Sequence, residues 1–288
     1  MWTAPLFALL VQSALAGAAA LVAPRAKLLA LVLGAAGAFA VPWFAGPNAL
    51  LRGLCGLLGG VALLRVIDLV RFRQTWSPLR RVAHVASVVD TRTLPRAPAR
   101  IDFGALARAV PWIGLTLVGF YVAHSPRLLV RWAGGLLLAY AIIEAGYEVV
   151  GAAYRALGFA APRLHVLPIA SLSVGELWGV RWARPISIWL RETCFRPFAR
   201  RGHAALGLLF GFVVSGFGHA YPVLVAIDLR LAAMMFGFFF VQGLFVVIEA
   251  RLGTSRWPRP ARRVWTVAIM IGSSPLFVEP ALRVLGYP

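Results

Sequence analysis

The amino-acid sequence predicts an all-α, polytopic membrane protein with about eight spanning helices and further helices along the membrane surface. Of its 288 residues, 60% are hydrophobic and only 14% are charged, and the mean hydropathy is +0.80. A soluble domain is about half apolar and about a quarter charged, so this composition indicates an integral membrane protein. Long uniform apolar runs favour helices over a β-barrel, whose strands would alternate. No hydrophilic stretch is long enough for a second domain, and we expect one domain over residues 1–288.

Eight apolar runs are candidates for spanning helices, because a helix that crosses a bilayer needs about 20 mostly apolar residues. They cover residues 3–22, 28–45, 53–70, 109–123, 132–150, 204–226, 231–248 and 264–285. No basic residue precedes the first run, which therefore predicts a spanning helix and not a cleaved signal. Within the third run, Arg65 and Asp68 are three residues apart and can pair on one helix face.

The charges give an independent check on the number of spans. The formal net charge is +19, and Lys27 is the only lysine among the basic residues. The loops after the first, third, fifth and seventh runs are rich in arginine, whereas the alternate loops are not. Basic loops tend to stay in the cytoplasm, so this alternation predicts cytoplasmic basic loops and both termini outside. We expect these arginines to face anionic lipid, and we expect no nucleic-acid partner.

Residues 154–203 form the longest basic loop, and they combine arginine with tryptophan. The residues concerned are Trp178, Trp182, Trp189, Arg181, Arg184, Arg191 and Arg196. Tryptophan prefers the headgroup level of a membrane, where arginine can bind phosphate. The pattern predicts interfacial helices on the cytoplasmic surface, interrupted at Pro185 and Pro197.

His219 is the strongest candidate for chemistry, because it is the one strongly polar side chain in the run 204–226. Ionisable groups inside spanning helices are costly and tend to face a cavity or a partner. A neutral imidazole can accept a proton from a hydroxyl near neutral pH. The alternative is a histidine that packs against a neighbouring helix, and the small residues Ser215, Gly216 and Gly218 suit either a helix or a substrate. His219 lies roughly 22 Å from the start of the helix at about 1.5 Å per residue, so a cytosolic reactant would need a long arm.

A cluster of arginines could hold a polyphosphate group, because guanidinium binds phosphate in a bidentate fork. Its members are Arg181, Arg184, Arg191, Arg196, Arg200 and Arg201. The alternative role is to set the topology and to contact anionic lipid. We expect Glu144, Glu148 and Glu279 to be ion-paired within the helix bundle or near helix ends. We expect surface positions for the remaining histidines, which are His84, His124, His165 and His203.

Cys55 and Cys194 lie in different contexts and suggest neither a disulfide nor a metal site. We find no spacing typical of metal ligands, no phosphate-binding glycine loop and no nucleophile elbow. The sequence therefore predicts no bound metal.

Three blocks within residues 160–250 resemble one known family. Ser171-Leu172 with Glu176-Leu-Trp-Gly-Val-Arg-Trp182 resembles the Ser-Leu-x-x-Phe-Trp-Gly-x-Arg-Trp signature of wax synthases. Ser215-Gly-Phe-Gly-His219 is similar to their Ser-Gly-x-x-His block, and residues 238–249, with Gly243, resemble the helix that follows. Wax synthases are the long-chain-alcohol acyltransferase branch of the membrane-bound O-acyltransferase superfamily, so the resemblance implies that fold.

The resemblance implies transfer of a fatty acyl group from acyl-CoA to a hydroxyl, with His219 as general base. The acceptor would be a long-chain alcohol and the product a wax ester. Acyl-CoA would be a co-substrate, and no other cofactor is implied. The substrate-binding residues implied are Trp178, Arg181, Trp182, Arg184, Ser215 and Gly216.

The sequence departs from the family directly after Trp182, where Ala183 stands in place of the usual Asn or His. Either Ser173 or Ser187 replaces this assisting group, or the group is dispensable, or the activity is lost or changed. Two other functions stay open. One is acylation of another lipid or natural-product hydroxyl. The other is a non-catalytic membrane binder or transporter, which the lack of visible repeat halves disfavours.

Overall fold

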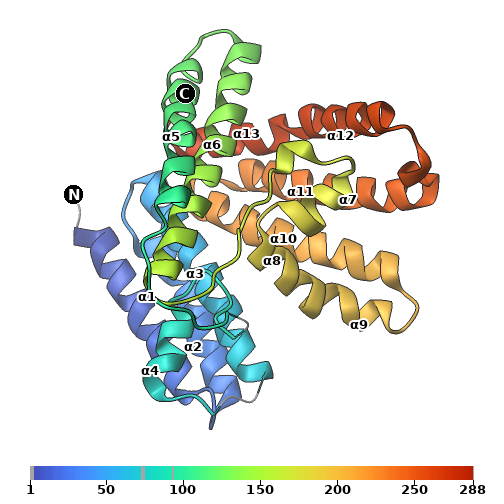
Figure 1. The fold of residues 1–288 in the computed structure, drawn as a ribbon. Helices are drawn as coiled ribbons and strands as arrows, with labels where there is room; N and C mark the ends of the chain where they lie inside the picture. The colour runs from blue at the N-terminus through green and yellow to red at the C-terminus, as the bar shows by residue number, and fades with distance from the viewer. Residues whose placement is uncertain (1–2, 73–74, 93, 288) are drawn as a thin grey trace. The chain divides into compact units, whose positions relative to one another are not determined.

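A computed structural model describes residues 3–72, 75–92 and 94–287, and within them it confirms the all-α prediction (Figure 1). Apart from one isolated β-bridge between Arg96 and Phe159, every regular element of these residues is helical. The longer helices are α1 (Thr3–Val22), α2 (Lys27–Phe39), α3 (Ala49–Arg71), α5 (Phe103–Val122), α6 (Leu128–Ala156), α10 (Ala204–Ala226), α11 (Leu229–Leu252), α12 (Arg259–Ser273) and α13 (Pro275–Val284). The shorter ones are η1 (Val41–Phe44), α4 (Pro78–Val85), η2 (Pro168–Ala170), α7 (Val174–Glu176), η3 (Leu177–Arg181), α8 (Arg184–Leu190), η4 (Arg191–Phe195), α9 (Arg196–Ala199) and η5 (Thr254–Arg256).

Among the described residues, seven helical segments are long and apolar enough to cross a membrane, and they coincide with the first seven predicted runs. The second segment, Lys27–Phe44, combines α2 with η1. The fourth and fifth helices are longer than predicted, because α5 begins six residues earlier and α6 extends at both ends. The Asp102 carboxylate caps α5 by accepting a hydrogen bond from the Ala105 amide (2.9 Å). These seven helices define a multi-pass membrane protein.

The eighth predicted run is a bent pair of helices and not one straight helix. α12 and α13 meet at an angle of 44°, and they make up the eighth span if the pair is counted as one. The bend falls at Ser274 and Pro275. Pro275 has no amide hydrogen to continue the helix. The Ser273 and Ser274 hydroxyls donate to the Ile269 and Ile271 carbonyls, and such bonds often bend a helix.

The chain divides into two compact units, each assembled from distant segments. Unit 1 comprises Met1–Thr93, Gly218–Ala233 and Val284–Gly286, and unit 2 comprises Leu94–Phe217, Met234–Arg283 and Tyr287–Pro288. Because both units draw on distant parts of the sequence, the single domain expected over residues 1–288 stays a prediction.

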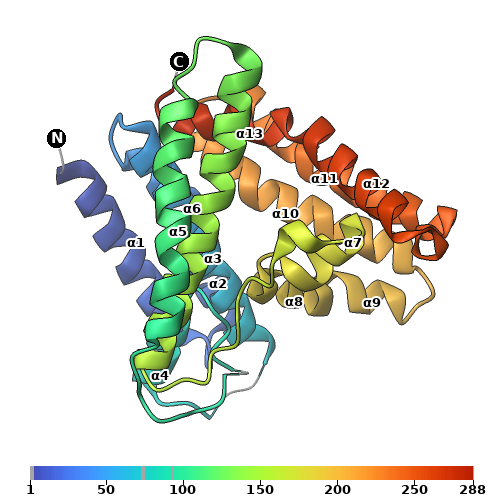
Figure 2. The same ribbon diagram turned by 45° about the horizontal axis from the view of Figure 1, so that its top comes forward.

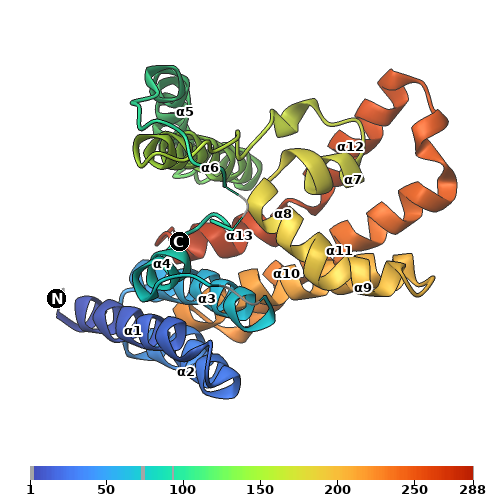
Figure 3. The ribbon, with the colours of Figure 1, turned by 60° about the horizontal axis from the view of Figure 1, so that its bottom comes forward.

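Unit 1 contains α1 to α4, which lie together in Figure 3, and the C-terminal half of α10. Small residues allow these helices to approach closely, since a Cβ added at Gly59 would lie 2.8 Å from the Ala38 Cα. A Cβ at Gly56 would lie 3.2 Å from the Pro222 Cα of α10. The Tyr221 hydroxyl also donates a hydrogen bond to the Phe39 carbonyl (2.6 Å). The end of α10 is therefore packed firmly against α2 and α3.

Unit 2 contains α5 and α6, which run side by side as an antiparallel pair (Figure 2). A Cβ added at Gly119 would lie 2.5 Å from the Leu138 amide nitrogen, so the two backbones pack in direct contact. On another face of α6, a Cβ at Gly135 would meet the Val278 side chain at 2.6 Å. Glycine thus places α6 close to both α5 and α13.

The basic loop 154–203 is partly helical, as expected, but only one of its two predicted interruptions is present. Pro185 lies in the first turn of α8, directly after a break at Trp182 and Ala183. At Pro197 the helical residues run on without a break from α8 through η4 into α9. The prediction of an interruption there is wrong. η4 is a π-helix, and its wider turn directly precedes the proline-containing turn.

Candidate functional site

The motif segment, which we define as residues 171–182, folds as a capped turn of helix. The Ser173 hydroxyl accepts a hydrogen bond from the Glu176 amide (2.8 Å), and the Glu176 carboxylate accepts one from the Leu172 amide (2.9 Å). This is a variant of the capping box, in which serine and glutamate satisfy the free amides at a helix start. The signal Ser-x-x-Glu was present in the sequence and could have predicted it. The cap fixes the start of α7, from which η3 continues.

Arg181 is paired within the chain. Its Nε donates to the Glu176 carboxylate (2.6 Å), and its Nη1 donates to the Val166 carbonyl (3.1 Å). Burial raises the pKa of the Glu176 carboxyl, but hydrogen bonds from Leu172 and Arg181 lower it more, so the pKa lies below its ordinary value. Arg184 similarly donates to the Arg163 carbonyl (3.0 Å). Arg181 therefore ties the motif segment to Val166, and Arg184 ties the start of α8 to Arg163.

Glu249 on α11 holds the N-terminal side of the motif segment. Its two carboxylate oxygens accept hydrogen bonds from the Val174 amide (2.8 Å) and the Gly175 amide (3.0 Å). The indole of Trp265 on α12 donates a third bond to the same carboxylate (3.0 Å). Glu249 is only 6% exposed, so these three donors replace water around the carboxylate.

Gln242, seven residues before Glu249 on α11, holds the other side of the motif segment. The Trp178 indole donates to the Gln242 side-chain oxygen (3.0 Å), and the Gln242 nitrogen donates to the Ser273 hydroxyl (2.7 Å). Gln242 is fully buried, at 0% exposed. Because its oxygen and its nitrogen both have protein partners, the orientation of Trp178 is determined by α11 and α12.

Trp178 and Trp182 lie close together within unit 2, with ring centroids 5.8 Å apart. Trp178 also contacts Phe212 of α10 and Phe238 of α11 edge to face, at 6.3 and 6.0 Å. Trp182 contacts Tyr140 of α6 at 5.8 Å. The two tryptophans predicted to bind substrate therefore belong to one aromatic cluster.

The second predicted block, Ser215–His219, lies on α10. Ser215 and His219 are four residues apart and share one face of this helix. At Gly216 the neighbour that approaches closely is another helix, because an added Cβ would lie 2.9 Å from the Phe236 ring of α11. Near Gly218, in contrast, an added Cβ would meet nothing within 4 Å among the described residues. His219 itself is partly exposed.

Pro222 changes the helix around His219. In a regular helix the amide of residue 222 would donate a hydrogen bond to the Gly218 carbonyl. Proline has no amide hydrogen, so Pro222 does not make this bond.

The seven predicted site residues are divided between the two compact units. His219 belongs to unit 1. The other six, Trp178, Arg181, Trp182, Arg184, Ser215 and Gly216, belong to unit 2.

Both serines considered as replacements for the group missing at Ala183 have local partners. Ser173 caps α7, as described above, and the Ser187 hydroxyl donates to the Arg184 carbonyl (3.1 Å). Ala183 itself adopts a left-handed conformation, with φ of 40°. The ring centroid of His165 lies 4.6 Å from that of Trp182, the residue directly before Ala183.

The prediction that His165 is a surface residue is wrong. His165 is 6% exposed, and its Nδ1 lies 3.3 Å from the Glu144 carboxylate, which is also buried. Glu144 sits mid-helix in α6, whereas His165 follows in the loop after it. The surface position was predicted because the residues around His165 form a loop of low hydropathy. In the structure, however, residues 164–166 fold back on α6 and bury the imidazole ring. The contact is an ion pair only when His165 is protonated, so the expected ion pairing of Glu144 stays a prediction.

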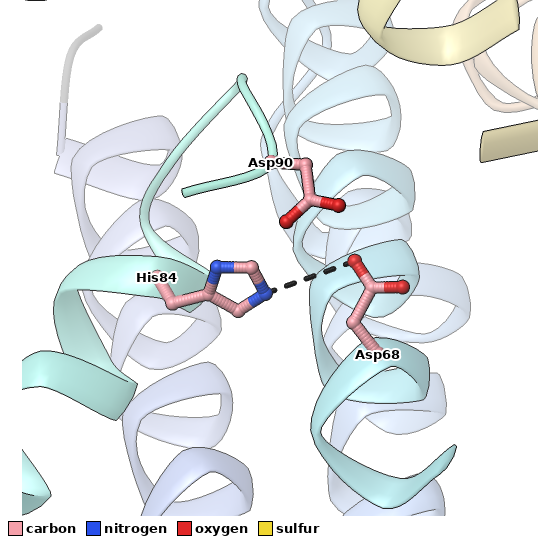
Figure 4. A group of neighbouring side chains, drawn as sticks. All are labelled: Asp68, His84 and Asp90. Carbon is pink, nitrogen blue, oxygen red and sulfur yellow. Dashed lines mark ion pairs between the residues drawn. The ribbon is translucent and has the colours of Figure 1, made fainter. Parts of the chain in front are cut away.

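His84 is buried too, so its predicted surface position is also wrong. It lies with Asp68 and Asp90 in unit 1, with possible metal-ligand atoms within 4.8 Å of one another (Figure 4). Each carboxylate, however, already accepts from arginine. Arg65 contacts Asp68 at 2.9 Å, and Arg92 contacts Asp68 at 3.2 Å and Asp90 at 2.6 Å.

The two carboxylates and two guanidinium groups of this cluster balance in charge. A divalent cation would lie beside both guanidinium groups, so the residues present do not fit a metal centre. Burial raises the pKa of Asp90, but hydrogen bonds from Arg92 lower it more, which holds the pKa of this carboxyl below its ordinary value. Arg65 also donates to the Ser87 and Val88 carbonyls, at 3.4 and 3.0 Å. We therefore interpret the cluster as an ion-pair network that fixes the segment after α4 onto α3.

The predictions for Glu148, Glu279, His124 and His203 are confirmed. Glu148 pairs with Arg108 of α5 at 2.9 Å, and Glu279 pairs with Arg131 at 3.0 Å. His124 and His203 are exposed, as predicted. Cys55 and Cys194 are buried, and neither forms a disulfide.

Comparison with known proteins gives no family. No family model matches the chain, and no curated protein matches it. The class of multi-pass membrane protein therefore rests on the helices themselves.

Proposed function

We propose that the protein is a membrane-bound O-acyltransferase that moves a fatty acyl group from acyl-CoA to a hydroxyl, with a long-chain alcohol as acceptor and a wax ester as product. A membrane-bound O-acyltransferase-like fold is part of this proposal. The basic loops would face the cytoplasm, next to the acyl-CoA, and both termini would lie outside.

One observation carries the proposal: two blocks that separately resemble the family bind each other directly. The helix 238–249 supplies both Gln242 and Glu249, and these side chains hydrogen-bond the motif segment at Trp178 and at the Val174 and Gly175 amides. The bonded residues are 64 to 75 positions apart in the sequence. If each block resembled the family only by chance, there would be no reason for the two blocks to contact each other in the folded protein.

In the proposed reaction, His219 takes the proton of the acceptor hydroxyl as its oxygen attacks the thioester carbonyl carbon. A C–O bond forms, the C–S bond breaks, and the leaving thiolate takes up the proton, so that ester and free coenzyme A result. Because Arg181 pairs with Glu176, we assign contact with the coenzyme A phosphates to exposed residues of η4 and the loop before α10. These are Arg191, Arg200 and Arg201.

Replacing His219 by alanine should lower the rate of ester formation about 10²–10⁴-fold, the usual contribution of a general base. The measurement uses purified full-length protein, labelled hexadecanoyl-CoA and hexadecanol, with ester separated from free acid. His203→Ala is the matched control, because this histidine is exposed and directly precedes α10.

Equal ester formation by the His219→Ala variant would remove His219 as the base. If the wild-type protein binds or hydrolyses acyl-CoA but forms no ester with any alcohol or lipid hydroxyl, the acyltransferase proposal is wrong and a binding function is favoured. Ester formation with other hydroxyl compounds, but not with long-chain alcohols, would keep the reaction and change the acceptor.

A further inference from the structure

α4 is an amphipathic helix whose inner face is fixed to the ends of α1 and α3 (Figure 3). Val85 is 3% exposed and belongs to a core that includes Ala20 of α1 and Leu69 of α3. The Arg81 side chain also donates a hydrogen bond to the Ala20 carbonyl (3.1 Å). On the outer face of the helix, Leu79 is 79% exposed. α4 therefore presents an outer face at the end of unit 1 where α1 and α3 terminate.

Exposed basic side chains surround this outer face. Arg80 lies on α4 itself, and its guanidinium is 4.3 Å from the centre of the Trp76 ring. Arg25 and Lys27 lie at the turn between α1 and α2, next to alanines of the same core. Arg71 ends α3. All four basic residues are exposed and have no ion-pair partner among the described residues. We define Arg25, Lys27, Arg71, Leu79 and Arg80 as the α4 surface.

The acidic residues of unit 1 do not neutralise these four cations. Residues 1–93 contain two carboxylate side chains, those of Asp68 and Asp90. Each is paired with arginine inside the network described above. The third acidic residue of the unit, Asp228, follows α10, whose end packs against Gly53 at the other end of α3. The positive charge of the α4 surface is therefore available to an anionic partner.

The apolar side chains beside the cations indicate what kind of anion this is. Leu79 is 79% exposed, and Leu28, at the start of α2, is 75% exposed. A soluble polyanion would pair with the arginines but would leave both leucines in water. A phospholipid offers phosphate to the cations and hydrocarbon to the leucines. Trp76, on which Arg80 lies, is the type of side chain that prefers the headgroup level of a membrane.

We propose that the α4 surface binds the phosphate groups of anionic phospholipids. α4 then lies along the membrane surface, with Leu79 inserted among the acyl chains and Arg80 at the phosphates. Arg25, Lys27 and Arg71 contact neighbouring headgroups. This assignment concerns unit 1 and does not depend on the acyltransferase proposal.

The direct test is hydrogen exchange, followed by mass spectrometry, of the full-length protein in lipid nanodiscs. One set of nanodiscs contains phosphatidylcholine only, and the other contains equal amounts of phosphatidylcholine and phosphatidylglycerol. We expect the amides of α4 to exchange at least about fivefold more slowly with phosphatidylglycerol, because one basic residue at an anionic surface contributes a factor of about five. High salt should remove this difference, since it screens exposed charges. Equal exchange of α4 in the two lipids at low salt would overturn the proposal.

The combined substitutions Arg25→Gln, Lys27→Gln and Arg80→Gln should abolish the difference between the two lipids. These side chains are exposed, so the variant keeps its core. A triple variant that still exchanges more slowly with phosphatidylglycerol, to the same extent as the wild type, would contradict the assignment.

The matched control removes three exposed arginines from elsewhere in the chain, by Arg127→Gln, Arg230→Gln and Arg251→Gln. It loses the same charge as the triple variant but should keep the difference between the lipids. Loss of the difference in this control would mean that net charge, and not the α4 surface, selects the lipid.

A second probe separates lipid from soluble phosphate. Inositol hexakisphosphate added to the phosphatidylcholine nanodiscs should leave the exchange of α4 unchanged. If it slowed the exchange as much as phosphatidylglycerol does, the α4 surface would be a site for soluble polyphosphates, and the lipid proposal would be wrong.

Discussion

Replacing Asp68 by alanine should lower the free energy of unfolding by about 3–5 kcal/mol, the cost of breaking a buried ion pair by removing one partner. The Arg65 and Asp68 side chains are 0% and 1% exposed, so water cannot replace the lost carboxylate. Arg92 would lose one of its two carboxylate partners in the same substitution. Equilibrium unfolding in mixed micelles with increasing sodium dodecyl sulfate measures the loss.

The matched control for Asp68→Ala is Glu192→Ala, which removes an exposed carboxylate from its pair with Arg196. That substitution should change the free energy of unfolding by less than about 1 kcal/mol. The double substitution Arg65→Met with Asp68→Leu should recover most of the loss, because it leaves no uncompensated charge at these positions. If Asp68→Ala were as mild as the control, the network would not stabilise unit 1.

Replacing Glu249 by alanine should release the motif segment from α11. The substitution leaves the Val174 and Gly175 amides and the Trp265 indole without their acceptor, and each buried unsatisfied donor costs about 1–3 kcal/mol. Hydrogen exchange followed by mass spectrometry should show exchange of residues 172–182 accelerated by about 10²-fold or more, because every 1.4 kcal/mol is a factor of about ten. Ester formation should fall as the motif segment loosens.

Two comparisons make the Glu249 result specific. Glu192→Ala, on η4, should leave the exchange of residues 172–182 unchanged, and the exchange of α1 to α3 should stay the same in both variants. Unaltered exchange of the motif segment in Glu249→Ala would mean that the cap formed by Ser173 and Glu176 is sufficient to hold it.

The sequence was most informative where structure depends on neighbouring residues. Seven of the eight apolar runs predicted a spanning segment that the structure contains, because the requirement for such a helix concerns composition and length alone. The pair Arg65–Asp68 was also predicted, since three residues along a helix bring two side chains to one face, and the contact is present at 2.9 Å. The bend between α12 and α13 was missed, although Ser274-Pro275 is a recognisable signal for it.

Contacts between distant segments could not be predicted from local patterns. His165 lies in a loop and His84 in the short helix α4, and only the folding of these segments onto α6 and α3 buries their rings. The role of Glu249 depends on a partner about 75 residues earlier in the chain, and no periodicity connects the two. Arg181 was expected to bind phosphate because of its neighbours, but Glu176, five residues before it, occupies its guanidinium.

The backbone at Ala183 has a consequence for protein engineering. Its φ of 40° and ψ of 50° fall in a region that costs alanine roughly 1 kcal/mol but that asparagine enters readily. Asparagine is also among the side chains that best begin a helix, and this residue directly precedes α8. The main-chain geometry at this position therefore suits asparagine, so the substitution Ala183→Asn would introduce an amide side chain here without remodelling the loop.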